Sequence, residues 1–394
     1  MKITFFKTIL FSAFLLSLAS SCKKEETVPE AYLRSGNSLA MADDNGNLII
    51  AGYNTSSSTG YDAALIKTNS AGDTLWSKKF GSSYSDAFYN VAKSNAGGFI
   101  ATGFSNKSSS NSPAMYVVIT DANGKLVNSG KFGGSNYSQG FNVLRHANPD
   151  SGYLVSGYIQ NSTYADRDLY LVRINNAGVS LWEKRYGSKN QVNSDTVNDA
   201  AYCVIGAPDG GYFLTGSIRG YSSCCGKVFL MKVSAKGDSL WTKTYNTGVG
   251  YSLILTKDNS IAISGSLQEG ASQDVFLIKT DTAGNLLWPM KTFGGTGYEY
   301  GASMVEASTG GFAITGITDS KGTQDVYLIR TDANGALIGS TTTYGGESED
   351  QGFGIVEMSN GDFCITGLSN TNGSYVFLNR VSSEGAQIWY KPFK

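Results

Sequence analysis

Short apolar runs separated by polar, glycine-rich segments make up the chain from about residue 37 to its end. Runs such as residues 312–317, 326–329 and 275–278 have the length of strands. The last two are apolar without alternation, which is typical of a strand covered on both faces. No segment of this region has a helical period. The pattern therefore predicts an all-β chain of short strands joined by tight turns.

One unit of about fifty residues recurs seven times in this region. The first marker is a glycine that follows a small residue in an apolar run, at Gly52, Gly103, Gly157, Gly216, Gly265, Gly316 and Gly367. The second marker is a glycine in a polar turn, at Gly72, Gly124, Gly178, Gly237, Gly284, Gly335 and Gly385. Two markers in step over the whole region indicate a propeller or a solenoid. We number the repeats 1 to 7 in chain order.

Each repeat is predicted to contain four antiparallel strands. A hairpin turn lies six residues before the first marker, and five of the seven residues there are glycine. A second hairpin carries a short polar residue three positions before the second marker. All five tryptophans lie four residues after the second marker, at Trp76, Trp182, Trp241, Trp288 and Trp389, with Asn128 and Gly339 in the other two repeats. An aromatic at one fixed place per unit indicates packing between adjacent units. We therefore predict a seven-bladed β-propeller with four antiparallel strands per blade over residues 37–394.

The N-terminus is predicted to direct export. Residues 1–21 carry two early lysines, an apolar run at 9–18 and small residues directly before Cys22. This is a secretory signal peptide, and its apolar run is too short to span a bilayer. The ending LASSC resembles the lipobox of bacterial lipoproteins, which implies cleavage before Cys22 and lipidation of that residue, with palmitate among the acyl chains. Residues 22–36 are then the lipidated N-terminus and its tether.

The tether also suggests where the anchor lies. Lys23, Lys24, Glu25 and Glu26 follow the cysteine. They resemble the export tag by which some Gram-negative lipoproteins reach the outer face of the outer membrane. We expect a lipid-anchored outer-membrane protein exposed at the cell surface, with a periplasm-facing anchor as the alternative.

The residue sequence of the repeats resembles that of known repeats. DGGYFLTGS occupies residues 209–217, and DVFLIKTDTAGNLLW occupies residues 274–288. This sequence pattern resembles the propeller repeats of a large group of bacterial lipoproteins and secreted proteins, most of them of unassigned function. The glycine-to-tryptophan spacing is also similar to the tryptophan-docking repeat. That repeat occurs in quinoprotein dehydrogenases and in the lipoprotein scaffold of the outer-membrane β-barrel assembly machinery.

Charge and residue usage exclude several functions. The formal net charge is −1 and there is no basic patch, so nucleic acid is not an expected partner. His146 is the only histidine, which excludes the common zinc sites and the histidine-based nucleophile relays. Cys203 and Cys364 fall in predicted strands and are expected to be buried fillers. Cys224 and Cys225 are adjacent in a predicted loop of an exported protein, which permits a vicinal disulfide.

Two acidic sets recur in the repeats. The first lies at the connection into the first strand, where it is expected to ring the mouth of the central channel, at Asp86, Asp199, Glu299 and Asp350, with Gln139 as the near equivalent in repeat 3. These side chains are candidate ligands for calcium or a polar molecule, and no other cofactor is predicted. The alternative is that each caps the backbone of its own loop. The second set, Asp62, Asp168, Asp274 and Asp325, precedes the third strands, and basic residues end those strands. We expect it to pair between blades.

The predicted function is a binding or scaffold module for a glycan or a protein at the cell surface, attached to the membrane through its lipid alone. The variable loops between second and third strands are rich in Ser, Asn and Tyr, which suits hydrogen bonding and ring stacking. The alternative is a lipid-anchored enzyme that uses the channel-mouth carboxylates. It would be a polysaccharide lyase or hydrolase, or a quinoprotein-like enzyme, although the quinoprotein enzymes typically need an eight-bladed ring.

Overall fold

The structure is a computed structural model. It describes residues 37–394 apart from 57–59, 107–112, 147, 149–150, 161–165, 188–197, 219–225, 270–271, 296, 372 and 394. The predicted signal peptide, Cys22 with its tether, and the Cys224–Cys225 pair lie outside the described residues. Within the described residues the regular elements are 27 strands, and no helix there is long and apolar enough to cross a membrane.

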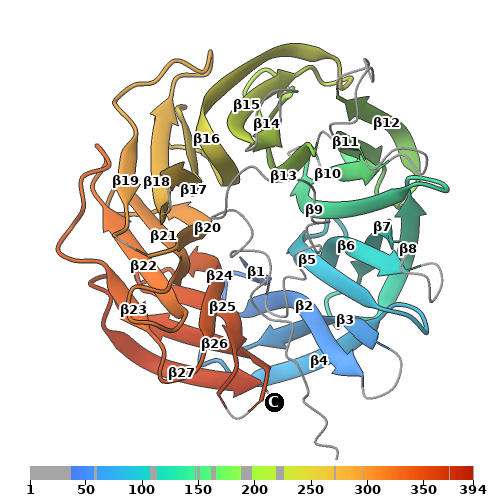
Figure 1. Cartoon of the computed structure of the whole chain (residues 1–394). Coiled ribbons are helices and arrows are strands. Elements are labelled where there is room, and N and C mark those ends of the chain that lie inside the picture. The colour runs from blue at the N-terminus through green and yellow to red at the C-terminus, as the bar shows by residue number, and fades with distance from the viewer. Residues whose placement is uncertain are drawn as a thin grey trace, which may run out of the picture.

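The strands form six sheets arranged around a central axis (Figure 1). Each of the first three repeats forms one four-stranded sheet, in which strands that follow one another in the sequence lie side by side. The first holds β1 (Ser38–Met41), β2 (Leu48–Ser56), β3 (Gly60–Thr68) and β4 (Thr74–Phe80). The second holds β5 (Asp86–Lys93), β6 (Phe99–Asn106), β7 (Pro113–Thr120) and β8 (Leu126–Phe132). The third holds β9 (Tyr137–Arg145), β10 (Tyr153–Gln160), β11 (Arg167–Ile174) and β12 (Ser180–Tyr186).

A seven-stranded sheet and two further four-stranded sheets follow. The seven-stranded sheet holds β13 (Ala200–Gly206), β14 (Tyr212–Ile218), β15 (Lys227–Val233), β16 (Ser239–Leu255), β17 (Ile261–Glu269), β18 (Ser272–Thr280) and β19 (Lys291–Phe293). The next holds β20 (Glu299–Glu306), β21 (Phe312–Thr318), β22 (Asp325–Thr331) and β23 (Thr342–Tyr344). The last holds β24 (Asp350–Glu357), β25 (Phe363–Ser369), β26 (Tyr375–Val381) and β27 (Gln387–Phe393).

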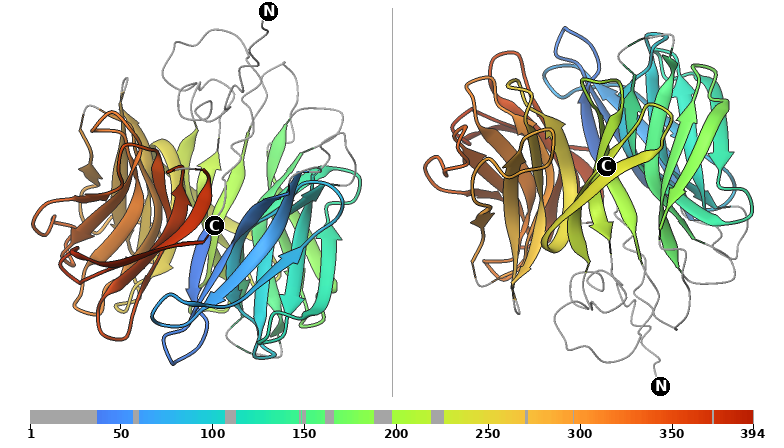
Figure 2. Two further views of the ribbon diagram at one scale, coloured as in Figure 1. Left: turned by 90° about the horizontal axis from the view of Figure 1, so that it is seen from below. Right: turned by 90° about the horizontal axis from the view of Figure 1, so that it is seen from above.

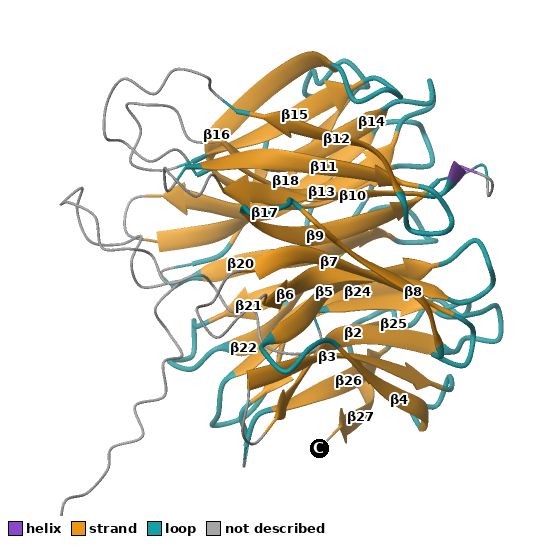
Figure 3. Ribbon diagram, turned by 90° about the vertical axis from the view of Figure 1, so that its right-hand side faces the viewer, coloured by secondary structure: helices purple, strands orange, loops and turns teal. Residues whose placement is uncertain are grey.

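All pairings between consecutive strands of a sheet are antiparallel, so the predicted hairpin order of strands is confirmed. The first strand of each repeat lies nearest the axis and the fourth lies at the rim (Figure 1). Side views show hairpins gathered at the two faces of the ring and strands filling the space between them (Figures 2 and 3). The seven-stranded sheet arises because β16 pairs with β15 through its first half and with β17 through its second half.

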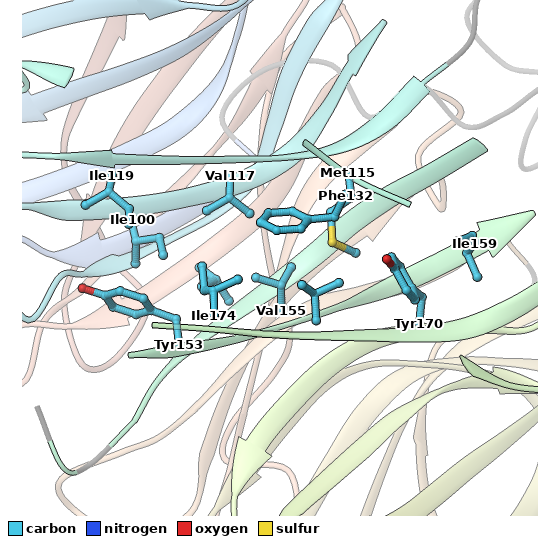
Figure 4. Packing of buried hydrophobic residues seen from close by; sticks show 12 residues of the cluster. Ile100, Met115, Val117, Ile119, Phe132, Tyr153, Val155, Ile159, Tyr170 and Ile174 are labelled. Carbon is cyan, nitrogen blue, oxygen red and sulfur yellow. The ribbon is translucent and has the colours of Figure 1, made fainter. Parts of the chain in front are cut away.

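The hydrophobic core lies between neighbouring sheets. Ile100, Val117 and Ile119 of repeat 2 pack against Val155 and Ile174 of repeat 3, all of them buried (Figure 4). Because the middle strands are covered on both sides, they read as nearly continuous apolar runs. The prediction that the third strands are buried on both faces is therefore confirmed.

The first and last sheets also share a core, so the ring is closed. Leu39, Leu48 and Ile50 of the first sheet form one buried cluster with Cys364 and Leu378 of the last. The two sheets lie side by side in Figure 1, coloured blue and red.

The tryptophans explain why the second marker is a glycine. Each indole packs on the second-marker glycine of the next repeat: a Cβ atom on Gly237 would lie 3.0 Å from Trp182, and one on Gly284 would lie 3.2 Å from Trp241. The predicted packing between adjacent units is therefore confirmed. Repeats 2 and 6 lack the indole and use polar contacts. The amide of Asn128 donates to the carbonyl of Ala177, and Arg330 donates to the carbonyl of Ser383 at 2.8 Å.

Candidate functional site

The predicted channel-mouth carboxylates are buried, and several hold backbone amides. Asp86 is fully buried and accepts a hydrogen bond from the N–H of Ser82 at 2.7 Å. Glu299 accepts from the N–H of Gly295 at 3.4 Å and from the Thr318 hydroxyl at 2.9 Å. Asp350 accepts from the N–H of Gly346 at 3.2 Å. Burial raises the pKa of each of these three carboxyl groups. These contacts support the alternative in which each acid caps its own loop.

Gln139 differs from those three in its register position, and Asp199 is placed by a backbone contact. The register places Asp86 opposite Ser105, two residues after the first marker, whereas Ser138 occupies that place in repeat 3 and Gln139 pairs with Tyr158. Gln139 is buried but lies one register position further on. Asp199 is buried beside the third strand of repeat 3, where its N–H donates to the carbonyl of Arg167 at 3.0 Å.

The two acidic sets meet between repeats. A Cβ atom on Gly345 would lie 2.2 Å from Asp325 Oδ1 and 3.0 Å from Asp350 Oδ2, so the two carboxylates face one turn. Asp274 and Glu299 converge on Gly294 in the same way. Burial, and then the negative charge of Asp350, raise the pKa of Asp325.

The basic residues at the ends of the third strands form their ion pairs within their own repeats, so the predicted ion pairing between blades is wrong. Arg330 and Arg380 reach the next repeat through carbonyl oxygens, those of Ser383 and Ser70. Lys232 contacts Asp209 at 2.5 Å and Lys279 contacts Asp258 at 2.7 Å, within the same repeat. The reason is geometric: the third strand ends beside the start of the second strand, whose hairpin supplies the aspartate.

In repeats 2 to 7 a bulge in the innermost strand directs one side chain toward the axis. Six of the first strands have a register shift against the second strand at the same place, opposite the first-marker glycine. The extra residues are Tyr89, Phe141, Tyr202, Tyr251, Ala302 and Phe353. A Cβ atom on the facing glycine would lie 1.7 to 1.9 Å from a first-strand carbonyl oxygen. The first marker is therefore glycine because the bulge leaves no room for a side chain.

The aromatic residues form a continuous row around the channel. Ring centroids are 5.5 Å apart for Tyr89 and Phe141, and 4.8 Å apart for Phe141 and Tyr202. The row continues to Tyr251 at 5.0 Å and from there to Tyr300 at 4.3 Å. We call these five residues the aromatic row. Spacings of this size are typical of favourable aromatic pairs.

Small polar residues follow the bulge and link the inner strands. Asn90 Oδ1 accepts from the N–H of Val143 at 3.1 Å, and Asn142 Oδ1 accepts from the N–H of Val204 at 3.3 Å. The Ser252 hydroxyl accepts from the N–H of Met304 at 3.1 Å. These bonds fix neighbouring bulges relative to one another.

The aromatic row and this polar layer line a cavity of about 200 Å³ on the axis. Phe353, Ala302 and Asn37 complete the wall where the aromatic row ends. No charged side chain is among the residues that line this cavity. Burial raises the pKa of Tyr202, Tyr251 and Tyr300, so their hydroxyls stay protonated at physiological pH. An uncharged wall of rings, hydroxyls and amides favours a neutral ligand.

The aromatic row was not predicted, although the sequence carries a signal for most of the bulged aromatic residues. Tyr89, Tyr202, Tyr251 and Phe353 all lie fourteen residues before the first marker of their repeats. That regularity is visible in the sequence alone. The bulge that turns these side chains toward the axis is not.

Other candidate residues play structural parts. In the described residues, His, Cys, Asp and Glu form no group of three or more that could hold a metal ion, so calcium remains a prediction. His146 Nδ1 accepts from the N–H of Asn148 at 3.3 Å. Cys203 and Cys364 are buried free thiols, as predicted, and burial raises their pKa to about 11 and about 12.

Neither a family model nor a curated protein sequence matches the chain. Solved structures do resemble it. A protein from Lactobacillus plantarum has 13% identity and a TM-score of 0.55 over 88% of this chain and 95% of its own. The Dos1 propeller has 10% identity and a TM-score of 0.51 over 89% and 78%. Sqt1 from Chaetomium thermophilum, bound to the N-terminus of ribosomal protein L10, has 9% identity and a TM-score of 0.51 over 90% and 88%. At these identities the likeness shows the fold, a β-propeller.

Proposed function

We propose that the chain is a lipid-anchored, seven-bladed propeller that serves as a binding or scaffold module at the bacterial cell surface and takes its ligand at the central cavity. The observation that carries this proposal is the cavity on the axis, lined by the aromatic row and by uncharged polar side chains. Recessed aromatic surface with a few fixed polar groups is the usual composition of a binding site.

A blade count of seven is supported by two observations. The sequence contains seven copies of both glycine markers. The seven-stranded sheet is then two blades that share β16, since that strand of 17 residues pairs with different partners in its two halves.

Binding is favoured over catalysis by the position of the carboxylates. An enzyme of the lyase or hydrolase type would need Asp86, Glu299 or Asp350 free to meet a substrate. Each of them instead accepts a hydrogen bond from its own loop. The Sqt1 structure, bound to a terminal segment of a ribosomal protein, is an example of a similar fold that holds a protein ligand. A protein or a glycan is the corresponding expectation here.

Lipid attachment is tested separately from ligand binding. We expect labelled palmitate to be incorporated into the wild-type chain and to be lost in Cys22→Ala. Protease treatment of intact cells should degrade a surface-exposed protein and leave a periplasm-facing one intact. Absence of label in the wild type would refute the anchor.

Ligand binding is tested by capture of cell-surface glycans and proteins on the purified full chain. We expect one or more ligands to be retained by the wild type and by Tyr84→Ala, and to be lost from Tyr202→Ala. Tyr84 is exposed on the connection between β4 and β5, whereas Tyr202 lines the cavity. Equal capture by both variants would show that the cavity is not the binding site.

A further inference from the structure

The central cavity combines a small volume with a wall of one chemical character. Its rings come from five successive repeats in mutual contact, and its polar atoms are hydroxyls and amides. We infer that this cavity binds a single uncharged sugar ring, as the terminal residue of a glycan. This inference rests on the proposed binding function and specifies the ligand of that same site.

The absence of charge in the lining decides against an ionic ligand. A charged group that enters a site without a counter-charge loses hydration that nothing replaces. The carboxylates of Asp86 and Asp350 are buried in turns, where a backbone amide donates to one oxygen of each. A sugar hydroxyl, in contrast, both donates and accepts, and so it suits a wall of tyrosine and serine hydroxyls and asparagine amides.

The volume decides the size of the ligand. Pockets for drug-sized ligands measure roughly 300 to 1,000 Å³, and this cavity, at about 200 Å³, is smaller. It therefore accommodates one ring rather than a chain of rings or a stretch of peptide. The rest of a glycan would extend from the channel mouth.

The shape of the wall decides between a sugar and a purely apolar ring. One layer is aromatic, formed by the bulged residues Tyr89, Phe141, Tyr202 and Tyr251, and the next layer is polar. A sugar ring has apolar C–H faces, which stack on aromatic rings, and a polar edge, which hydrogen-bonds. The two layers match these two parts of one ring.

Isothermal titration calorimetry on the full chain tests this inference. The detergent should carry no sugar headgroup, because such a headgroup would compete for the cavity. The probes are glucose, galactose, mannose and N-acetylglucosamine, with glucuronic acid and glucosamine as charged counterparts. We expect one-to-one binding of at least one neutral sugar, and at least about ten-fold weaker binding of its charged counterpart.

Three variants locate the site. Tyr202→Ala should weaken the neutral sugar about ten-fold, since one stacking ring is lost, and Tyr84→Ala should leave binding unchanged. Ala302→Phe keeps the test valid if Tyr202→Ala does not fold. It places a ring at a bulge where Phe353 stands in the next repeat, so the fold should accept it, and it should fill the cavity and abolish binding.

The outcomes separate this inference from the proposed function. Equal affinity for charged and neutral sugars, or unaltered sugar binding in Ala302→Phe, overturns it. Failure of every neutral sugar overturns it as well. If a protein is still captured in a Tyr202-dependent way in that case, the binding function stands with a peptide as its ligand. If capture is also independent of Tyr202, both proposals fall.

Discussion

At the scale of single residues, the first marker glycine sets the direction of the channel-lining side chains. Gly265 faces the bulge at Tyr251, and a Cβ atom there would lie 1.9 Å from the carbonyl oxygen of Val249. Two backbones in such close contact cannot separate without flattening the bulge. Flattening would shift the register by one residue and turn Tyr251 away from the axis. The glycine thus links the fold to the cavity.

We expect Gly265→Ala to lower the free energy of unfolding by about 3 kcal/mol, as overpacking against backbone does. Urea denaturation followed by circular dichroism measures this. Gly206→Ala is the matched control, because Gly206 has no positive φ and no atom within 4 Å of its Cβ position. Its substitution should change stability by less than about 0.5 kcal/mol. Similar losses in the two variants would contradict the role of the bulge.

Asp350 shows how a buried acid serves a turn. Its folded-state pKa is raised by burial, so the folded chain binds the proton more tightly than the unfolded chain. Its contribution to stability is therefore largest below the usual aspartate pKa of 3.8 and falls as pH rises through the raised value. At neutral pH the ionised group costs stability, while its oxygen still satisfies the N–H of Gly346.

We expect Asp350→Asn to be at least as stable as the wild type at pH 7 and to flatten the pH dependence above pH 4. The amide keeps an acceptor for Gly346 and removes the negative charge that faces Asp325 across Gly345. Asp350→Ala should instead lose about 1 to 3 kcal/mol, because the Gly346 N–H is left unsatisfied. Melting temperatures from pH 4 to pH 8 measure both. A stability loss in Asp350→Asn that grows with pH would contradict this assignment.

At the scale of strands and turns, the sequence predicted most of the architecture because its signals are local. Hairpin glycines, apolar runs and tryptophans each report on a few neighbouring residues, and these elements form as expected. The long strand β16 was not predicted. Four other connections into a first strand pair a turn glycine with an acid or serine: Gly81 with Asp86, Gly133 with Ser138, Gly294 with Glu299 and Gly345 with Asp350. Between repeats 4 and 5, Asn246 and Gly248 stand in their places, so nothing folds the chain back and the strand continues.

The cavity was not predictable by the same reasoning. Strict alternation along a strand assigns side chains to its two faces, and one bulged residue reverses that assignment. Whether a strand is bulged depends on close contact with the facing glycine of another strand. The carboxylates, in contrast, were easy to select as polar and recurrent, but their burial depends on how adjacent sheets close over the turns.

The docked tryptophan is the element that joins one repeat to the next. Trp241 packs on Gly284, and its ring lies 6.0 Å from that of Phe213. We expect Trp241→Ala to cost about 2 kcal/mol in denaturation experiments, below the value for a fully buried indole because the side chain is partly exposed. Asn128→Ala at the equivalent place in repeat 2 should cost about 1 kcal/mol, since it loses one hydrogen bond. Equal losses would show that the indole adds nothing beyond a polar contact.

At the scale of the whole molecule, the contact that closes the ring repeats the contact within it. Trp389 of the last repeat packs on Gly72 of the first, with 2.7 Å between the indole and a Cβ position, as Trp241 packs on Gly284. Lys391 pairs with Asp73 at 3.0 Å beside it. If the ring is closed in solution, Trp389→Ala should cost about the same as Trp241→Ala, about 2 kcal/mol. In an open stack the terminal indole would have no neighbour to lose, and its substitution would be nearly silent. Denaturation of the two variants side by side distinguishes these cases.

Hydrogen exchange adds a second measurement. Opening the contact between the first and last sheets should expose the amides of β2 and β26 before those of β10 and β11, because only β2 and β26 face the broken contact.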